Sequence, residues 1–108
     1  MHVFEAITPV DYARLREELN PPLLIDVREA WEFAYAHVEG AQLLPLSDLP
    51  QWASTLDKNG SYVVMCHHGV RSEYACQLLM RSGFTDVRNL EGGIDAWSRL
   101  VDAAVPKY

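Results

Sequence analysis

The residues best suited to chemistry lie together at positions 66–72, which read Cys-His-His-Gly-Val-Arg-Ser. An apolar run precedes this segment and a helical pattern follows it, so we expect a loop between a buried strand and the start of a helix. Backbone N–H groups converge at such a place and the helix dipole adds partial positive charge. Both effects favour the thiolate form of a cysteine. The pattern therefore predicts that Cys66 is an activated nucleophile.

The other residues of this loop suit the binding of a small, negatively charged group. Gly69 allows the backbone to turn tightly and to approach a ligand. Arg71 carries a permanently charged planar group that can bind an oxyanion. Ser72 can serve the helix start or donate a hydrogen bond to sulfur or oxygen. We expect these residues to hold a substrate close to the thiol, with Val70 at the start of the helix.

Simpler roles compete with these assignments. Cys66 alone could be a small buried side chain at a strand end, because free cysteine is commonly buried. His67 and His68 beside a cysteine suggest a metal, yet consecutive loop residues seldom converge on one ion and no spaced Cys and His partners accompany them. We therefore expect no metal site and two histidines that line the loop. Cys76 lies inside an apolar helical pattern and is expected to pack in the core.

A second polar segment begins at Asp26, directly after the apolar run at residues 23–25. Asp26 can pair with Arg28 or with Arg71 and so hold the cysteine loop in shape. It can equally serve as a cap or turn residue for the helix that follows. We expect Asp26 and Arg28 to support the loop.

Charged and aromatic residues outside these two segments are given structural roles. Three acids are expected to form a solvent-exposed helix face: Glu29, Glu32 and Glu39. The tryptophans are expected to pack in the core or at its edge: Trp31, Trp52 and Trp97.

The elements that position these residues alternate along the chain. Strands are predicted at residues 3–7, 23–25, 41–44, 62–65 and 87–90. Helices are predicted at residues 9–19, 29–35, 48–56, 70–82 and 94–101, with Thr8 and Ser47 as N-cap residues. The alternation predicts βαβ units and a mostly parallel α/β sheet that is covered on both faces. Ligands bind beyond the carboxyl ends of such strands, where Asp26 and Cys66 stand.

Length and composition limit the classes of protein that this chain can be. Its 108 residues, with no linker or repeat, predict a single domain over residues 1–108. A net charge of −6 argues against nucleic acid or an anionic membrane as partner. It does not argue against a small anionic donor, because residues 58–72 contain no acid. Two cysteines are too few for a disulfide framework and no leader segment is visible, so we expect a cytoplasmic location.

Four motifs, in this order, resemble those of the single-domain rhodanese (thiosulfate sulfurtransferase-like) family. Residues 23–29 are similar to the family's DVR motif at a strand end. Residues 36–41 resemble its GHIPGA segment, with Ala36 and Glu39 in place of the usual Gly and Pro. Residues 66–72 match the CxxGxRS active-site loop, and residues 83–84 and 90–97 match the late GF…LxGGxxAW pattern. The resemblance covers about residues 7–100.

This resemblance implies a three-layer α/β fold around a central, mostly parallel, five-stranded sheet flanked by helices. It also implies a sulfurtransferase in which Cys66 takes sulfane sulfur from a small donor such as thiosulfate and becomes a persulfide. Backbone N–H groups of residues 67–71 would stabilise that persulfide. The acceptor would be cyanide or a thiol, free or carried by a protein. No cofactor is implied, and the oligomeric state and the physiological donor and acceptor stay open.

Two other functions occur on this fold. Phosphatases and arsenate reductases place the arginine six residues after the cysteine, whereas Arg71 follows Cys66 by five. The smaller ring of N–H donors suits one sulfur atom better than a phosphate, so we rank sulfur transfer above phosphate chemistry. A non-catalytic binding or regulatory module is the other alternative. Such modules often lack the cysteine, but its presence is compatible with docking of a partner's thiol.

Overall fold

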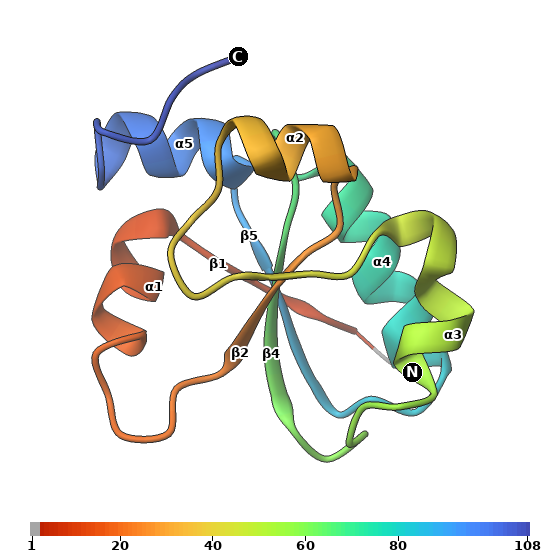
Figure 1. The fold of residues 1–108 in the computed structure, drawn as a ribbon. Helices are drawn as coiled ribbons and strands as arrows, with labels where there is room; N and C mark the ends of the chain where they lie inside the picture. The colour runs from red at the N-terminus through yellow and green to blue at the C-terminus, as the bar shows by residue number, and fades with distance from the viewer. Residues whose placement is uncertain (1–2) are drawn as a thin grey trace.

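The chain alternates short parallel strands with helices, as a computed structural model that describes residues 3–108 shows (Figure 1). The strands are β1 (Glu5–Ile7), β2 (Leu23–Asp26), β3 (Gln42–Leu43), β4 (Ser61–Met65) and β5 (Asp86–Leu90). The helices are α1 (Pro9–Leu15), α2 (Ala30–Tyr35), the 3₁₀ turn η1 (Leu46–Asp48), α3 (Leu49–Ala53), α4 (Val70–Arg81) and α5 (Gly93–Leu100). The α/β class and the five-stranded sheet expected from the sequence are confirmed.

The five strands form one parallel sheet in the order β1-β5-β4-β2-β3. The central strand is β4, which pairs with β2 on one side and β5 on the other. Its last four residues are buried, because a parallel sheet with both faces covered is made of continuous apolar runs. The carboxyl end of β4, which leads into Cys66, therefore lies in the middle of one edge of the sheet.

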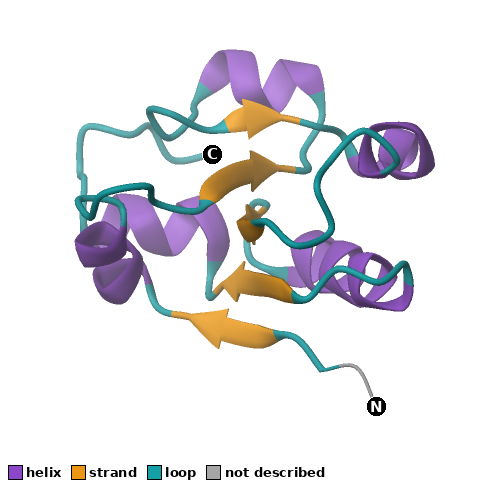
Figure 2. Cartoon of the chain, turned by 90° about the horizontal axis from the view of Figure 1, so that it is seen from below, coloured by secondary structure: helices purple, strands orange, loops and turns teal. Residues whose placement is uncertain are grey.

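Helices cover both faces of this sheet, so the fold has three layers (Figure 2). On one face, sheet side chains such as Val64 pack in a core with Leu79 of α4 and with Phe84 of the loop that follows α4. On the other face, sheet side chains such as Val63 pack in a second core with Tyr12 of α1 and Trp97 of α5. The short helix α2 lies across the end at which β2 and β4 finish (Figure 1). None of the helices described between residues 3 and 108 is long and apolar enough to span a bilayer.

Two predicted helices are shorter than the sequence pattern suggested. The helix predicted at residues 9–19 begins at its expected cap, since Thr8 Oγ1 accepts a hydrogen bond from Asp11 N (3.1 Å), but α1 ends at Leu15. Leu19 is 92% exposed, so a longer helix would bury no further apolar surface. The prolines at positions 21 and 22 then favour extended chain.

The helix predicted at residues 48–56 is replaced by η1 and a short α3 that ends at Ala53. Ser47 is not its N-cap as predicted, because Ser47 lies inside the 3₁₀ turn. The turn starts after Pro45, whose extended backbone begins it without any side-chain cap.

Candidate functional site

The candidate site is the loop that joins β4 to α4. Cys66 follows β4 directly, and only 1% of the residue is exposed. Its Sγ accepts hydrogen bonds from Gly69 N (3.1 Å), Ser72 N (3.4 Å) and Ser72 Oγ (3.3 Å). Ser72 N belongs to the first turn of α4, where backbone N–H groups carry partial positive charge. Three donors that converge on one sulfur stabilise negative charge there.

The shape of the loop depends on Gly69 and on a residue that the sequence analysis did not single out, Asn89. Gly69 has φ +104°, in the left-handed region that favours glycine. Asn89 Nδ2 donates to Gly69 O (3.1 Å), and Asn89 Oδ1 accepts from Ser72 Oγ (2.5 Å). The Ser72 hydroxyl has a single hydrogen, so it can donate to only one of Asn89 Oδ1 and Cys66 Sγ at a time. The sequence did contain a signal for Asn89, because it is a polar residue between the apolar Val87 and Leu90 of a mostly buried strand.

The start of α5 packs directly against this loop. Ile94 N donates to Cys66 O (2.9 Å), and Asp95 N donates to His67 O (3.1 Å). Gly93, the residue before Ile94, has φ +60°, and a Cβ there would lie 2.5 Å from His67 O. A glycine at position 93 is therefore what allows α5 to hold the backbone of the cysteine loop in place.

Asp26 forms a buried ion pair with Arg28 and also accepts a hydrogen bond from Arg28 N (3.1 Å) as a turn residue, so two of the roles left open for it are present together. Arg28 Nη2 lies 2.7 Å from Asp26 Oδ2 and Arg28 Nε 2.9 Å from Asp26 Oδ1, and neither side chain is exposed. Arg28 Nη2 also donates to Ala36 O (2.6 Å). The pair thus joins the end of β2 to the end of α2, and the partner of Asp26 is Arg28 rather than Arg71.

Arg71 is paired with Glu32, which the sequence analysis placed wrongly on a solvated helix face. Arg71 Nη1 lies 2.6 Å from Glu32 Oε1 and Arg71 Nη2 2.9 Å from Glu32 Oε2, so the contact is bidentate. Glu32 is only 3% exposed because Arg71 reaches it from the start of α4, whereas Glu29 and Glu39 are exposed as expected. The hydrogen bond from Arg71 lowers the pKa of Glu32 to about 2, and the same bond raises the pKa of Arg71. The Arg71 guanidinium, which was expected to bind an oxyanion, is therefore already paired with the Glu32 carboxylate.

Tyr108 completes the network from a position that the sequence analysis missed. Arg28 Nη1 donates to Tyr108 Oη (2.6 Å), which donates in turn to Glu32 Oε2 (2.7 Å). Burial, and the hydrogen bond to Glu32, raise the pKa of Tyr108 to about 12. Its ring stacks on that of His67 at 3.9 Å and 7°. Tyr108 is 80 residues from Arg28 in the sequence, so no local pattern marks it.

His67 and His68 line the loop, and their rings stack at 3.9 Å. Burial lowers the pKa of His67, with a further contribution from His68, so His67 is neutral at pH 7. Ligand atoms of these histidines and of Asp95 lie within 4.8 Å of one another. Stacked rings direct their in-plane lone pairs side by side rather than to one point, and Asp95 already accepts from Arg99 Nε (3.1 Å). This arrangement does not match the geometry of a metal centre.

The tryptophans and the second cysteine mostly have the structural roles predicted for them. Trp52 and Trp97 are buried, but Trp31 is 62% exposed and its ring makes an edge-on contact with Tyr108. Cys76 is fully buried in the core under α4, and burial raises the pKa of its thiol to about 12.

The Glu32 carboxylate is expected to make stability depend on pH. Its folded pKa of about 2 lies below the ordinary 4.5, so its contribution is complete above pH 4.5 and is lost as the pH falls toward 2. Glu32→Gln should lower the free energy of unfolding by on the order of 2 kcal/mol near neutral pH, after allowance for solvent around the half-exposed Arg71. Urea unfolding of both proteins should show this gap shrinking as the pH falls. A gap that stays constant in acid would contradict a role through charge.

Fold and site together define a class of parallel α/β proteins in which the central strand ends at a cysteine held by an N–H-lined loop. The family model "Rhodanese-like domain" matches residues 8–100, and the chain belongs to this family. The family resemblance stated from the sequence motifs is therefore confirmed.

The curated relatives of this chain include proteins much longer than it and a protein of similar length. "Adenylyltransferase and sulfurtransferase MOCS3-1" of Zea mays is 38% identical over 94% of this chain, but the chain spans only 23% of that protein. The same share, 23%, holds for MOCS3-2 of Zea mays. "Thiosulfate sulfurtransferase GlpE" of Pseudomonas aeruginosa is 30% identical, with 93% of this chain and 89% of that protein covered. The family and these relatives support a sulfurtransferase-type transferase.

Solved structures with this fold include a rhodanese-like domain protein from Staphylococcus aureus. Its TM-score is 0.83 at 30% identity, with 97% of this chain and 99% of that chain covered. A protein from Staphylococcus saprophyticus gives a TM-score of 0.82 at 28% identity, over 95% of this chain and 99% of that one. The three-layer, rhodanese-like fold expected from the sequence is therefore confirmed.

Proposed function

We propose that this protein is a sulfurtransferase that carries sulfane sulfur as a persulfide on Cys66. The observation that supports this most is the set of three donor groups within hydrogen-bond distance of Cys66 Sγ, which are Gly69 N, Ser72 N and Ser72 Oγ. Fixed donors of this kind serve a thiolate and a persulfide anion equally well. The family and the sulfurtransferase names of relatives agree with this chemistry.

In the first half of the cycle, the Cys66 thiolate attacks the outer sulfur of the donor. A new S–S bond forms at Cys66, and the S–S bond of the donor breaks. With thiosulfate, the electron pair of the broken bond leaves with sulfite, so no oxidant or reductant is needed. The negative charge on the terminal persulfide sulfur then lies in the field of the loop N–H groups and the start of α4.

In the second half, a nucleophilic acceptor removes the terminal sulfur. Cyanide would take it as thiocyanate, and a thiol, free or on a protein, would take it as a new persulfide. In either case the bonding pair of the S–S bond returns to Cys66 as thiolate. Both cysteines are free thiols, which suits the reducing cytoplasm expected from the sequence. Neither nucleic acid nor a membrane takes part in this proposal.

The phosphatase alternative receives no support from the loop. Such chemistry needs an arginine free to grip the phosphate oxygens. Here both Nη atoms of Arg71 are within 2.9 Å of the Glu32 carboxylate oxygens.

Exposure of the purified protein to a sulfane donor should load one sulfur atom. Intact-mass measurement is expected to show a gain of about 32 Da, the mass of the sulfur in a persulfide, which cyanide or a thiol removes. Thiosulfate and an organic persulfide should both be tried. If no sulfane donor gives the adduct, the enzyme assignment fails and the non-catalytic binding module becomes the better explanation.

A further inference from the structure

The two arginines of the site are each neutralised by a carboxylate. Arg28 is paired with Asp26 and Arg71 with Glu32, at N–O distances of 2.7 Å and 2.6 Å. Beside them, His67 is neutral at pH 7 because burial lowers its pKa. The positive field at Cys66 therefore comes from the backbone N–H groups and the helix start, and neither Arg28 nor Arg71 adds a free positive charge to offset a second negative charge on a donor.

Arg71 is held firmly away from an incoming donor. Glu32 accepts two hydrogen bonds from Arg71, one from Tyr108 Oη and one from Glu29 N. If Arg71 turned toward a donor, it would leave a buried carboxylate without its counter-charge, which is costly. The packing of Tyr108 between Arg28 and His67 keeps that carboxylate in place.

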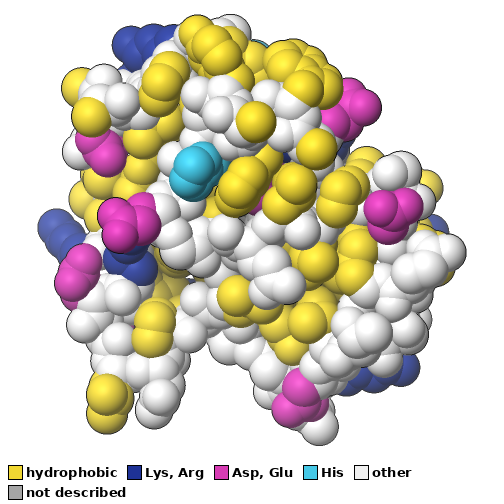
Figure 3. Space-filling view, in the orientation of Figure 1, with side chains coloured by type: hydrophobic (Ala, Val, Ile, Leu, Met, Phe, Trp, Pro, Cys, Tyr) yellow, Lys and Arg dark blue, Asp and Glu magenta, His cyan; other side chains and the backbone are white. Residues whose placement is uncertain are grey.

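Exposed apolar side chains lie on the two helices that the Arg71–Glu32 pair joins: Trp31 and Tyr35 of α2, and Val70 and Tyr74 of α4. All four are more than half exposed. Trp31 and Tyr35 contact the Tyr108 ring edge-on, and Tyr108 stacks on His67 of the loop. Hydrophobic side chains gather over α2 on the face shown in Figure 3.

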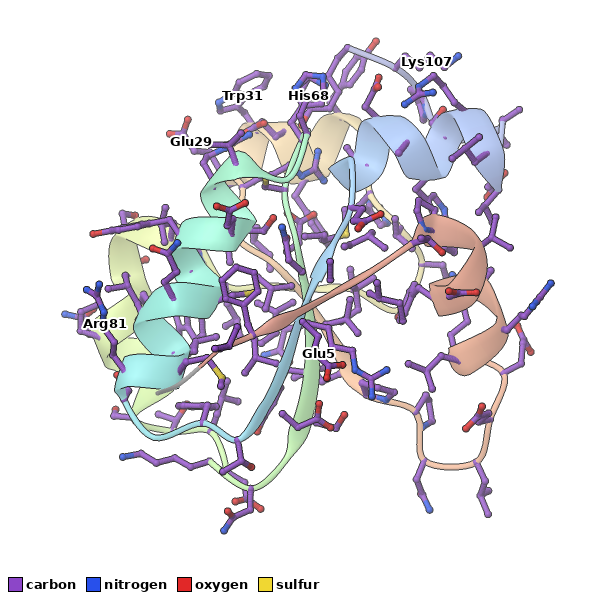
Figure 4. All side chains as sticks on the ribbon, turned by 180° about the vertical axis from the view of Figure 1, so that it is seen from behind. Glu5, Glu29, Trp31, His68, Arg81 and Lys107 are labelled. Carbon is purple, nitrogen blue, oxygen red and sulfur yellow. The ribbon has the colours of Figure 1, made fainter. Side chains whose placement is uncertain are left out.

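Figure 4 shows Trp31 and His68 at the same end of the molecule, with Glu29 beside Trp31. An exposed acid near these aromatic side chains repels a doubly charged donor further, while the aromatic rings favour a carbon skeleton.

We propose that Glu32, held by Tyr108, sets the donor specificity of Cys66 by neutralising Arg71, and that the preferred donors are organic sulfane carriers with at most one negative charge. This inference rests on the proposed function. Inorganic thiosulfate, a dianion without a carbon skeleton, is then a poor donor. Glu32 is a specificity-determining, positioning residue, because it acts through Arg71 and does not touch the sulfur.

An organic thiosulfonate transfers its outer sulfur by the same chemistry as thiosulfate. The two donors can therefore be compared for the effect of charge and carbon skeleton alone. The Cys66 thiolate attacks the outer sulfur of benzenethiosulfonate, a new S–S bond forms, and the S–S bond of the donor breaks with its electron pair on benzenesulfinate. Each side of this equation carries two negative charges. An alkyl persulfide reacts in the same way and releases a thiolate.

The test compares kcat/KM for benzenethiosulfonate and for thiosulfate, with cyanide as acceptor and thiocyanate as product. Each kcat/KM is divided by the rate constant for the reaction of the same donor with a free thiol in solution. This division removes the difference in intrinsic reactivity between the two donors. In the unaltered protein the normalised ratio should favour benzenethiosulfonate by at least about tenfold, the effect of roughly one unneutralised charge near a protein surface. Glu32→Gln should lower this ratio by about tenfold because Arg71 becomes free to bind the dianion.

Two further variants separate charge from structure. Glu73→Gln removes the same charge from an exposed residue of α4 and should leave the ratio within about twofold of its original value. Tyr108→Phe keeps the ring but loses both hydrogen bonds, and should move the ratio in the same direction as Glu32→Gln even if the latter folds poorly. A variant that only loosens the fold lowers both rates together and leaves the ratio unchanged.

A ratio near one in the unaltered protein, or a ratio that neither Glu32→Gln nor Tyr108→Phe lowers, would overturn the specificity inference while leaving sulfur transfer intact. Absence of any persulfide on Cys66 with either donor would overturn the proposed function itself, and the inference with it.

Discussion

Cys66→Ser is expected to abolish sulfur loading and to reduce thiocyanate formation by about a thousandfold or more, because a serine hydroxyl in this loop forms no persulfide. The substitution replaces one atom of a residue that is 1% exposed, and a hydroxyl can accept the same N–H bonds from Gly69 and Ser72. The fold should therefore survive. Intact mass after donor treatment measures the first effect, and the cyanide assay measures the second.

Cys76→Ala is the matched control for this experiment. Cys76 is the other free cysteine, it lies fully buried in the core, and burial raises the pKa of its thiol to about 12. The control should retain both the adduct and the activity. A sulfur adduct on the Cys66→Ser protein, or loss of the adduct in Cys76→Ala at normal stability, would show that the wrong thiol has been assigned.

Asp26→Asn is expected to cause the largest loss of stability, about 3–5 kcal/mol in the free energy of unfolding, because it leaves a buried charge without its partner. Neither Asp26 nor Arg28 has any exposed side-chain surface. Asparagine has nearly the same shape as aspartate, so the effect reports charge rather than packing. Urea unfolding at neutral pH measures this loss, and the slope of the unfolding free energy against urea concentration should stay unchanged.

Asp86→Asn provides the comparison at the surface. Asp86 lies 3.7 Å from Arg88, and both side chains are partly exposed. Its loss should change the free energy of unfolding by less than about 1 kcal/mol. If the two substitutions had equal effects, the Asp26–Arg28 pair would not be the support for the site that its burial indicates.

Features that depend on neighbours in the chain could be predicted from the sequence. The apolar run of β4, the loop after it and the helical pattern from Val70 place Cys66 at a strand end and a helix start. Thr8 caps α1 because its oxygen needs only the N–H of Asp11. The alternation of strands and helices led to the parallel sheet, since such connections have few alternative arrangements.

The partners of the polar side chains could not be predicted in this way. Arg71 meets Glu32 across 39 residues of sequence, and Tyr108 meets Glu32 across 76. The periodicity of α2 marked Glu32 as polar and therefore as exposed, because a helical pattern does not show which neighbouring element will cover a given face. The ends of α1 and of the helix predicted at residues 48–56 were misplaced for a related reason: their length depends on what they pack against.

The sequence by itself thus determined the family, the order of the elements and the position of Cys66 in its loop, because these follow from local patterns and motif spacing. Only the tertiary structure decided that Asp26 belongs to Arg28, that Glu32 occupies Arg71 and that Tyr108 closes the network over His67. The physical reason is that charge at a buried site depends on which side chains folding brings together, and those contacts join residues that are distant in the chain. That pairing leaves the Arg71 guanidinium, which the sequence suggested as an oxyanion ligand, already bound to a carboxylate.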